Sequence, residues 1–468
     1  SPLVRNYSSL ACSALPSAVK TVAFSGDGTC FRASSIARSR NARQRPASTK
    51  SGRTRKPSRL NCSSCAGESN FFTLYKLAAV ATFAYIGASK KGMSTMKSLR
   101  WIVCALAPIA VLAACQPSTT VRDSAPPVGQ LGRTVAPTRY SIELSIDPSK
   151  DAFSGKVVID ITLKEAQDAI WLHGKNLQVS EVYLTDASSD RIDASYAERQ
   201  ESGVALVTLA RNAPAGAAQL HFTYSAPFNT SDNALFKIER GGDYYAATQF
   251  EAIAARQAFP GFDEPGFKVP FDLSVIARKG DAVVATTPEV SAKDLADGSV
   301  LHVFARTRPL PTYLIAIAVG PYDVVDYGMI PANSVRDHGV PLRGIAAKGH
   351  GREMQYALKN TAGLLSALET YFGTPYPYEK LDLIAVPETF GGAMENVGAI
   401  AYDEDLMLMD DNSPLDQRRD YASTHAHEMS HMWFGDLVTP AWWNDIWLNE
   451  SFASWMENKA AHAYWPEG

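Results

Sequence analysis

The sequence predicts an α+β protein in which a β-rich domain over residues 136–326 precedes a domain of helices and strands over residues 327–468. Apolar residues alternate with polar ones along the first region, which is the period of strands. Apolar residues at helical spacing begin only after Pro341. With 468 residues, 46% of them hydrophobic, the chain is long enough for two or more packed domains.

The first 95 residues differ from the rest in composition. They contain 15 Lys and Arg but only two acidic residues, whereas the remainder contains 30 basic and 46 acidic residues. Residues 1–70 also lack apolar periodicity, so they have no pattern for a packed core. We interpret residues 1–95 as a disordered leader that is not part of the native protein. A transit peptide is the alternative, but a complete export signal follows downstream.

Residues 96–115 have the pattern of a lipoprotein-type signal peptide. A basic start at Met96 precedes an apolar run over residues 101–111, which is too short to span a bilayer. The run closes on Leu-Ala-Ala-Cys at residues 112–115, which resembles the lipobox of bacterial lipoproteins. The resemblance implies a periplasmic protein of the bacterial cell envelope, held at the outer membrane by lipid on Cys115.

Cysteine usage limits the chemistry of the folded region. All six cysteines lie at or before residue 115, so no intrachain disulfide can form after it. A metal in residues 116–468 would be held by His and carboxylate side chains. Cys62 and Cys65 form an isolated C-x-x-C, which we interpret as a chance occurrence.

A Pro- and Gly-containing linker over residues 116–135 leads into the β-rich domain. Alternating apolar residues then predict a hairpin formed by residues 140–146 and 157–163. The apolar run Tyr313–Val319 predicts a buried strand. Further short strands are expected around Trp171, Tyr183, Leu206, Phe222, Leu273, Val284 and Val303.

The second domain should contain three helices and a strand. Apolar spacing predicts a helix over residues 354–372 and a strand over residues 381–386. A second helix should begin at Ser413 as its N-cap and stop near Gly435, and a third should lie near residues 450–463.

The second of these helices carries the sequence His-Glu-Met-Ser-His at residues 427–431. His427 and His431 are four apart, so both imidazoles face one side and can reach a single metal ion. Glu428 is close enough to act on a metal-bound water. Glu450 would be the third ligand by spacing, and two imidazoles favour zinc over magnesium or calcium, with other transition metals left open. A helix surface with two solvated histidines is the alternative. We expect His425, which faces away, to be structural.

The longer pattern resembles the aminopeptidase N family of gluzincins. Three segments match the zinc-binding, exopeptidase and β-domain signatures of that family: residues 427–450, Gly392-Ala393-Met394-Glu395-Asn396, and Thr248-Gln249-Phe250-Glu251 with Asp263-Glu264-Pro265. Together they extend over residues 136–468. The resemblance implies a saddle-like, all-β N-terminal domain followed by a thermolysin-like zinc peptidase domain that is truncated at its C-terminus.

The resemblance also assigns a role to each site residue. Glu428 is the catalytic base that activates a water bound to one Zn²⁺ per chain, and the metal ligands are His427, His431 and Glu450. Substrate would be bound by Gln249, Glu251, Gly392, Ala393, Met394, Glu395 and Asn396. Glu395 and Glu251 would hold the free amine, which a carboxylate pair stabilises while penalising blocked or internal peptides.

The expected function is therefore a zinc aminopeptidase acting on peptides with a free N-terminus, with no nucleic-acid partner. Oligomeric state is not predicted. One alternative is an epoxide hydrolase of the leukotriene-hydrolase branch, which tends to have Gln where Glu251 stands. A non-catalytic scaffold is another, although scaffolds tend to lose the ligands that are intact here. The family's transition-state tyrosine would lie beyond residue 468, so we expect residues 116–468 alone to be inactive or nearly so.

Overall fold

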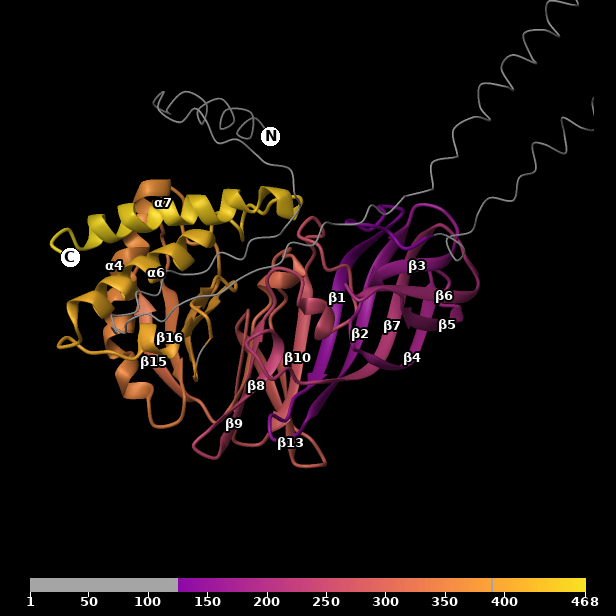
Figure 1. Cartoon of the computed structure of the whole chain (residues 1–468), viewed down its shortest axis with the longest axis horizontal. Helices are drawn as coiled ribbons and strands as arrows, with labels where there is room; N and C mark the ends of the chain where they lie inside the picture. The colour runs from indigo at the N-terminus through magenta and orange to yellow at the C-terminus, as the bar shows by residue number, and fades with distance from the viewer. Residues whose placement is uncertain (1–124, 389) are drawn as a thin grey trace, which may run out of the picture. The chain divides into compact units, whose positions relative to one another are not determined.

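The structure is a computed structural model that describes residues 125–388 and 390–468 (Figure 1). The predicted leader, the signal peptide with Cys115 and residues 116–124 of the linker lie outside the described residues. The described part contains a mostly β region followed by a region of helices on a smaller sheet. The predicted α+β fold class is thus confirmed.

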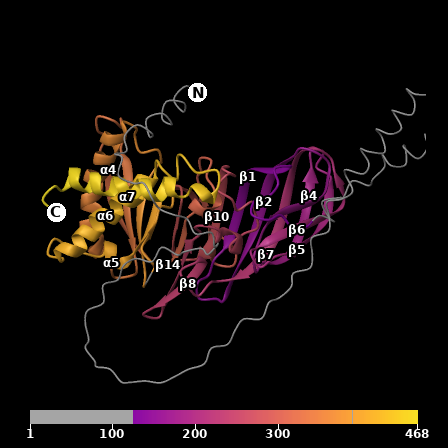
Figure 2. The ribbon, with the colours of Figure 1, turned by 45° about the horizontal axis from the view of Figure 1, so that its top comes forward.

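A ten-stranded sheet forms the first part of the β region, in the order β12-β13-β10-β1-β2-β7-β4-β5-β6-β3. Its strands are β1 (Val135–Ser145), β2 (Ala152–Leu163), β3 (Gln167–His173), β4 (Gln178–Asp186), β5 (Arg191–Glu198), β6 (Val204–Ala213), β7 (Gly216–Pro227), β10 (Phe271–Arg278), β12 (Glu289–Asp294) and β13 (Ser299–Phe304). The predicted hairpin is confirmed, because β1 and β2 pair antiparallel with Tyr140 opposite Ile159. Figure 2 shows β1, β2, β7 and β4 side by side.

A four-stranded sheet completes the β region, in the order β11-β14-β9-β8. Its strands are β8 (Ala234–Arg240), β9 (Asp243–Gln249), β11 (Ala282–Ala285) and β14 (Ile317–Gly320), and a short 3₁₀ helix, η2 (Ala255–Gln257), follows β9.

The prediction of one buried strand over residues 313–319 is wrong in its first half. Thr312–Leu314 form a 3₁₀ helix, η3, and the strand begins only at Ile317. The run is buried, as its apolar character indicated. Two threonine hydroxyls, however, accept hydrogen bonds from the backbone amides where the strand begins. The Ala316 amide donates to Thr286 Oγ1, and the Ile317 amide donates to Thr248 Oγ1. Apolar composition predicted burial here but not the backbone's partners.

The second region is built on a five-stranded sheet in the order β15-β16-β17-β19-β18. Its strands are β15 (Asp323–Ile330), β16 (Val340–Ala346), β17 (Leu381–Val386), β18 (Ala393–Met394) and β19 (Ala399–Asp403). β15 pairs with β16 and starts a few residues before the predicted boundary at residue 326. β18 is an edge strand that pairs only with β19, so its other side has no strand neighbour among the described residues.

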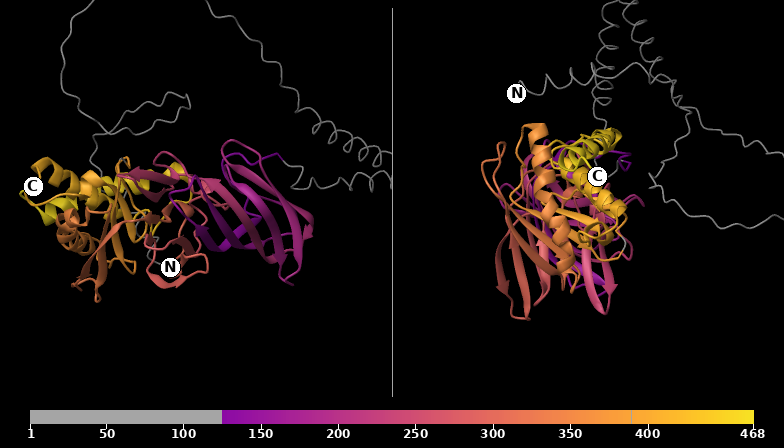
Figure 3. Two further views of the ribbon diagram at one scale, coloured as in Figure 1. Left: turned by 90° about the horizontal axis from the view of Figure 1, so that it is seen from below. Right: turned by 90° about the vertical axis from the view of Figure 1, so that its left-hand side faces the viewer.

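The helices are grouped next to this sheet (Figure 3). They are α4 (Gln355–Phe372), α5 (Glu404–Met407), α6 (Leu415–His431) and α7 (Trp447–Tyr464), with 3₁₀ turns η4 (Gly351–Met354) and η5 (Trp443–Asp445). α6 packs against both α4 and α7, which also contact each other. No helix in the described ranges is both long and apolar enough to cross a membrane.

The predicted N-cap of α6 is displaced by one residue. Pro414 is the cap, and the helix begins at Leu415 with no side-chain cap hydrogen bond. The Ser413 hydroxyl instead accepts the Asp410 amide at 3.0 Å, within the preceding turn. α6 ends at His431, and Gly435 lies beyond a short turn with φ of +125°. His431 is therefore the last residue of the helix that presents both histidines.

Candidate active site

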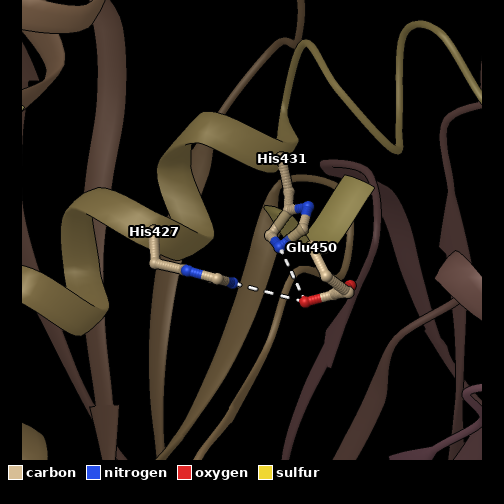
Figure 4. A group of neighbouring side chains, drawn as sticks. All are labelled: His427, His431 and Glu450. Carbon is tan, nitrogen blue, oxygen red and sulfur yellow. Dashed lines mark ion pairs between the residues drawn. The ribbon is translucent and has the colours of Figure 1, made fainter. Parts of the chain in front are cut away.

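α6 and the first turn of α7 bring the three predicted metal ligands together. Figure 4 shows the imidazoles of His427 and His431 extending from one helix toward the carboxylate of Glu450. The Glu450 Oε2 atom lies 3.5 Å from His427 Nε2 and 3.8 Å from His431 Nε2. All three ligand atoms lie within 4.8 Å of one another.

Each histidine is oriented by a partner on its other ring nitrogen. His427 Nδ1 lies 2.9 Å from Glu457 Oε2, and His431 Nδ1 lies 3.0 Å from the Phe434 carbonyl oxygen. Both acceptors favour a proton on Nδ1 and therefore leave Nε2 for a metal. Glu457 is seven residues after Glu450 on α7, so the same helix face supplies both a ligand and an orienting carboxylate.

The donor set fits a zinc ion. Donors at about 2.0–2.2 Å from a tetrahedral ion lie roughly 3.3–3.5 Å apart, close to the spacing between the Glu450 oxygen and the two imidazoles. The local charge agrees. Burial alone would lower the pKa of His427, but hydrogen bonds to Glu450 and Glu457 raise it to about 10. The same carboxylates would attract a metal cation.

A group of carboxyls adjoins the metal ligands. Oxygens of Glu251, Glu395 and Glu450 lie within 4.8 Å of one another, as do ligand atoms of Glu395, Glu428 and His431. Burial, and next the charge of Glu450, raise the pKa of Glu395 to about 8. Among the described residues, Glu395 Oε1 has no hydrogen-bond partner. Carboxyls outnumber the basic side chains here, and a positively charged ligand would reduce the repulsion between them.

The exopeptidase-signature segment runs along the edge of the five-stranded sheet. Ala393 and Met394 form β18, with Ala393 half-buried and Met394 buried. Gly392 has φ of +123°, a conformation that favours glycine, and its amide donates to Asp403 Oδ2 at 2.9 Å. Asn396 is buried, and within the described ranges its side-chain amide has no hydrogen-bond partner.

The β region contributes the turn that follows β9. Gln249 Oε1 accepts the Glu251 amide at 3.1 Å, so the Gln249 side chain supports the turn that carries Glu251. A buried ion pair between Arg256 and Asp263, at 2.8 Å, holds the segment immediately after it. The structure thus brings Glu251 to a site whose other residues lie more than 140 positions later in the chain.

Three residues near the site were not singled out from the sequence. Glu457 orients His427, Asp403 accepts amides at the start of β18, and Tyr402 donates to or accepts from His425 Nδ1 at 2.6 Å. The i, i+7 spacing of Glu450 and Glu457 was a usable signal for the first. His425 is buried and also contacts Thr361, in agreement with the structural role expected for it.

Comparison with known proteins gives a consistent result. Residues 136–314 match the peptidase M1 N-terminal domain, and residues 356–467 match the peptidase family M1 domain. Aminopeptidase N of Acetobacter pasteurianus is 32% identical over 339 residues, covering 70% of this chain and 91% of that protein.

Longer relatives are also similar. Aminopeptidase M1-B of Oryza sativa subsp. japonica is 32% identical over 72% of this chain, and aminopeptidase N of Lactococcus lactis is 35% identical over 70%. The chain spans 38% and 37% of the lengths of these two proteins. The matched domains and the arrangement of the site agree: the chain belongs to peptidase family M1, the aminopeptidase N family.

Proposed function

We propose that this chain carries the metal site of a zinc-dependent aminopeptidase that removes N-terminal residues from peptides. One observation carries the proposal: a His427, His431 and Glu450 ligand group shares Glu450 with a carboxylate group formed with Glu251 and Glu395. A metal centre and an ammonium-binding group are thus adjacent, which is the arrangement that an exopeptidase requires.

His427, His431 and Glu450 would hold the zinc ion. When bound, zinc supplies Lewis acidity that makes water a stronger nucleophile and polarises a peptide carbonyl. Glu428, which is 6% exposed, takes the proton from the attacking water and returns it to the leaving amine. Glu428 is in the same group of neighbouring ligand atoms as Glu395 and His431, so its carboxyl is within reach of the reacting centre.

Glu395 and Glu251 bind the substrate's free α-ammonium, since a cation relieves the repulsion between buried carboxyls. A peptide in extended form would then pair along the open side of β18, where Gly392 and Ala393 allow close backbone approach. The ammonium sets the position of the first peptide bond relative to His431 and Glu450. Cleavage one residue from the N-terminus follows.

Zinc content tests the metal proposal directly. The purified chain should bind about one zinc ion, and His431→Ala should lose it because a tetrahedral site cannot keep its affinity with one imidazole removed. The exposed His462 on α7 gives a matched control, and His462→Ala should keep its zinc. Zinc retained by His431→Ala, or absent from the wild type, would contradict the proposed site. Metal analysis after dialysis measures the zinc content of the wild type, His431→Ala and His462→Ala.

We also propose that the protein is exported and lipid-anchored through Cys115, in the bacterial envelope. The support is the lipobox-like sequence at residues 112–115. A mass measurement of the mature N-terminus from the native host should give a diacylglyceryl-modified Cys115. An unmodified N-terminus at any other position would contradict this proposal.

A further inference from the structure

Tyr313 belongs to the β region but contacts both segments that flank the metal ligands. Its side chain is 1% exposed. The hydroxyl donates to the Gly435 carbonyl at 3.3 Å, just beyond the end of α6, and accepts from Asn449 Nδ2 at 3.3 Å. Asn449 is the residue immediately before the ligand Glu450. Tyr313 thereby connects the turn after His431 to the first turn of α7.

The first turn of α7 has few other anchors. Trp447 and Leu448 are 59% and 46% exposed, and the Glu450 side chain is 44% exposed. Asn449, at 2% exposed, is the only fully buried residue among these four. The orientation of the turn, and with it the direction of the Glu450 carboxylate, therefore depends on what Asn449 contacts.

Tyr313 is itself held rigidly. It lies in η3, where the Thr312 hydroxyl donates to Asp263 Oδ1 at 2.6 Å, and Asp263 is paired with Arg256. Its ring packs edge-on against Trp443 at 5.2 Å, in the turn that leads into α7. A phenol fixed in this way is suited to holding the turn after α6 and the first turn of α7 at a constant separation.

The space around this contact is tight. A Cβ added at Gly435 would lie 3.1 Å from Asn449 Nδ2 and 3.3 Å from His431 Nδ1. The side chains of Asn449 and His431 therefore both lie close to Gly435. A shift of Asn449 would displace Gly435 and, through it, the ligand His431. The Gly435 carbonyl keeps a second donor, Thr439 Oγ1 at 2.6 Å, whereas no other hydrogen bond from Asn449 Nδ2 is found in the described ranges.

We infer that Tyr313 is a positioning residue for the metal site, which acts through Asn449 to hold the first turn of α7 and thus Glu450 against His427 and His431. The inference rests on the proposed zinc site and adds a specific dependence of that site on the β region. Partners outside the ligand shell typically change metal affinity about 10–100-fold when they are removed.

Zinc affinity, measured by competition with a chromogenic chelator, tests the inference on the full chain. Tyr313→Phe keeps the ring contacts and removes only the hydroxyl, so it should weaken zinc binding about tenfold while the circular dichroism spectrum is unchanged. Tyr224→Phe is the matched control, because its buried hydroxyl donates to Ala258 O at 2.6 Å within the β region. It should leave zinc affinity unchanged.

A double variant separates positioning from a general loss of stability. If Tyr313 acts through Asn449, Tyr313→Phe should add no further loss of affinity in an Asn449→Ala background. Additive losses, or an unchanged affinity in Tyr313→Phe, would overturn the inference. If the wild type binds zinc and Tyr313→Phe binds it with the same affinity, this inference alone is refuted. If the wild type binds no zinc, the proposed metal site is refuted as well.

Discussion

Replacing Glu428 with Gln should lower peptide turnover by about 10²–10⁴-fold and leave the zinc content unchanged. Glu428 is not one of the three ligand residues around Glu450, so the metal site should survive. Gln has nearly the same shape but cannot take a proton from water. The rate loss would therefore come from proton transfer, which is the contribution expected of a general base.

The measurement is steady-state turnover of a peptide amide by the full-length protein, alongside metal analysis of each variant. Glu353→Gln provides the control, since Glu353 is exposed on η4 and its carboxylate bonds only His350 among the described residues. It should match the wild type. Loss of zinc together with activity would assign Glu428 a ligand role, and undiminished turnover would exclude it as the base.

Replacing Glu395 with Gln should raise KM for peptides with a free N-terminus by at least about 30-fold, because truncating one partner of a buried charge pair costs about 2–5 kcal/mol. Glu395 is 3% exposed, and its Oε1 atom lies 3.9 Å from His431 Nδ1. That oxygen has no hydrogen-bond partner among the described residues. The substrate ammonium would be that partner. Replacing the Glu395 carboxylate leaves Glu251 as the carboxyl proposed to bind the amine.

The comparison that decides this uses pairs of identical peptides, one free and one N-acetylated, with the wild type and Glu395→Gln. The wild type should cleave only the free peptide, and the preference should shrink in the variant because the ammonium contact is what produces it. Cleavage of acetylated peptides by the wild type would refute the exopeptidase proposal and favour an endopeptidase. Turnover of an epoxide substrate instead would favour the leukotriene-hydrolase branch.

Local sequence patterns were sufficient to predict those elements in which apolar residues recur with the same period as buried positions. β1 and β2 alternate because one face of each is buried, and α4 repeats its apolar residues because one side packs on the sheet. The two-residue β18 could not be found in this way, since it is defined by pairing with β19. η3 was missed for a similar reason: its apolar residues are buried, but side-chain hydroxyls take up the neighbouring backbone amides.

By itself, the sequence determined the metal-ligand pair, because a four-residue spacing on a helix directs His427 and His431 to one side whatever surrounds them. Only the tertiary structure decided what else reaches that point. Glu251 comes from a turn in the β region, Glu457 from the face of α7 that carries Glu450, and Tyr313 from a 3₁₀ helix in the β region. Such contacts depend on how sheets and helices pack across long separations in sequence, which no local period records.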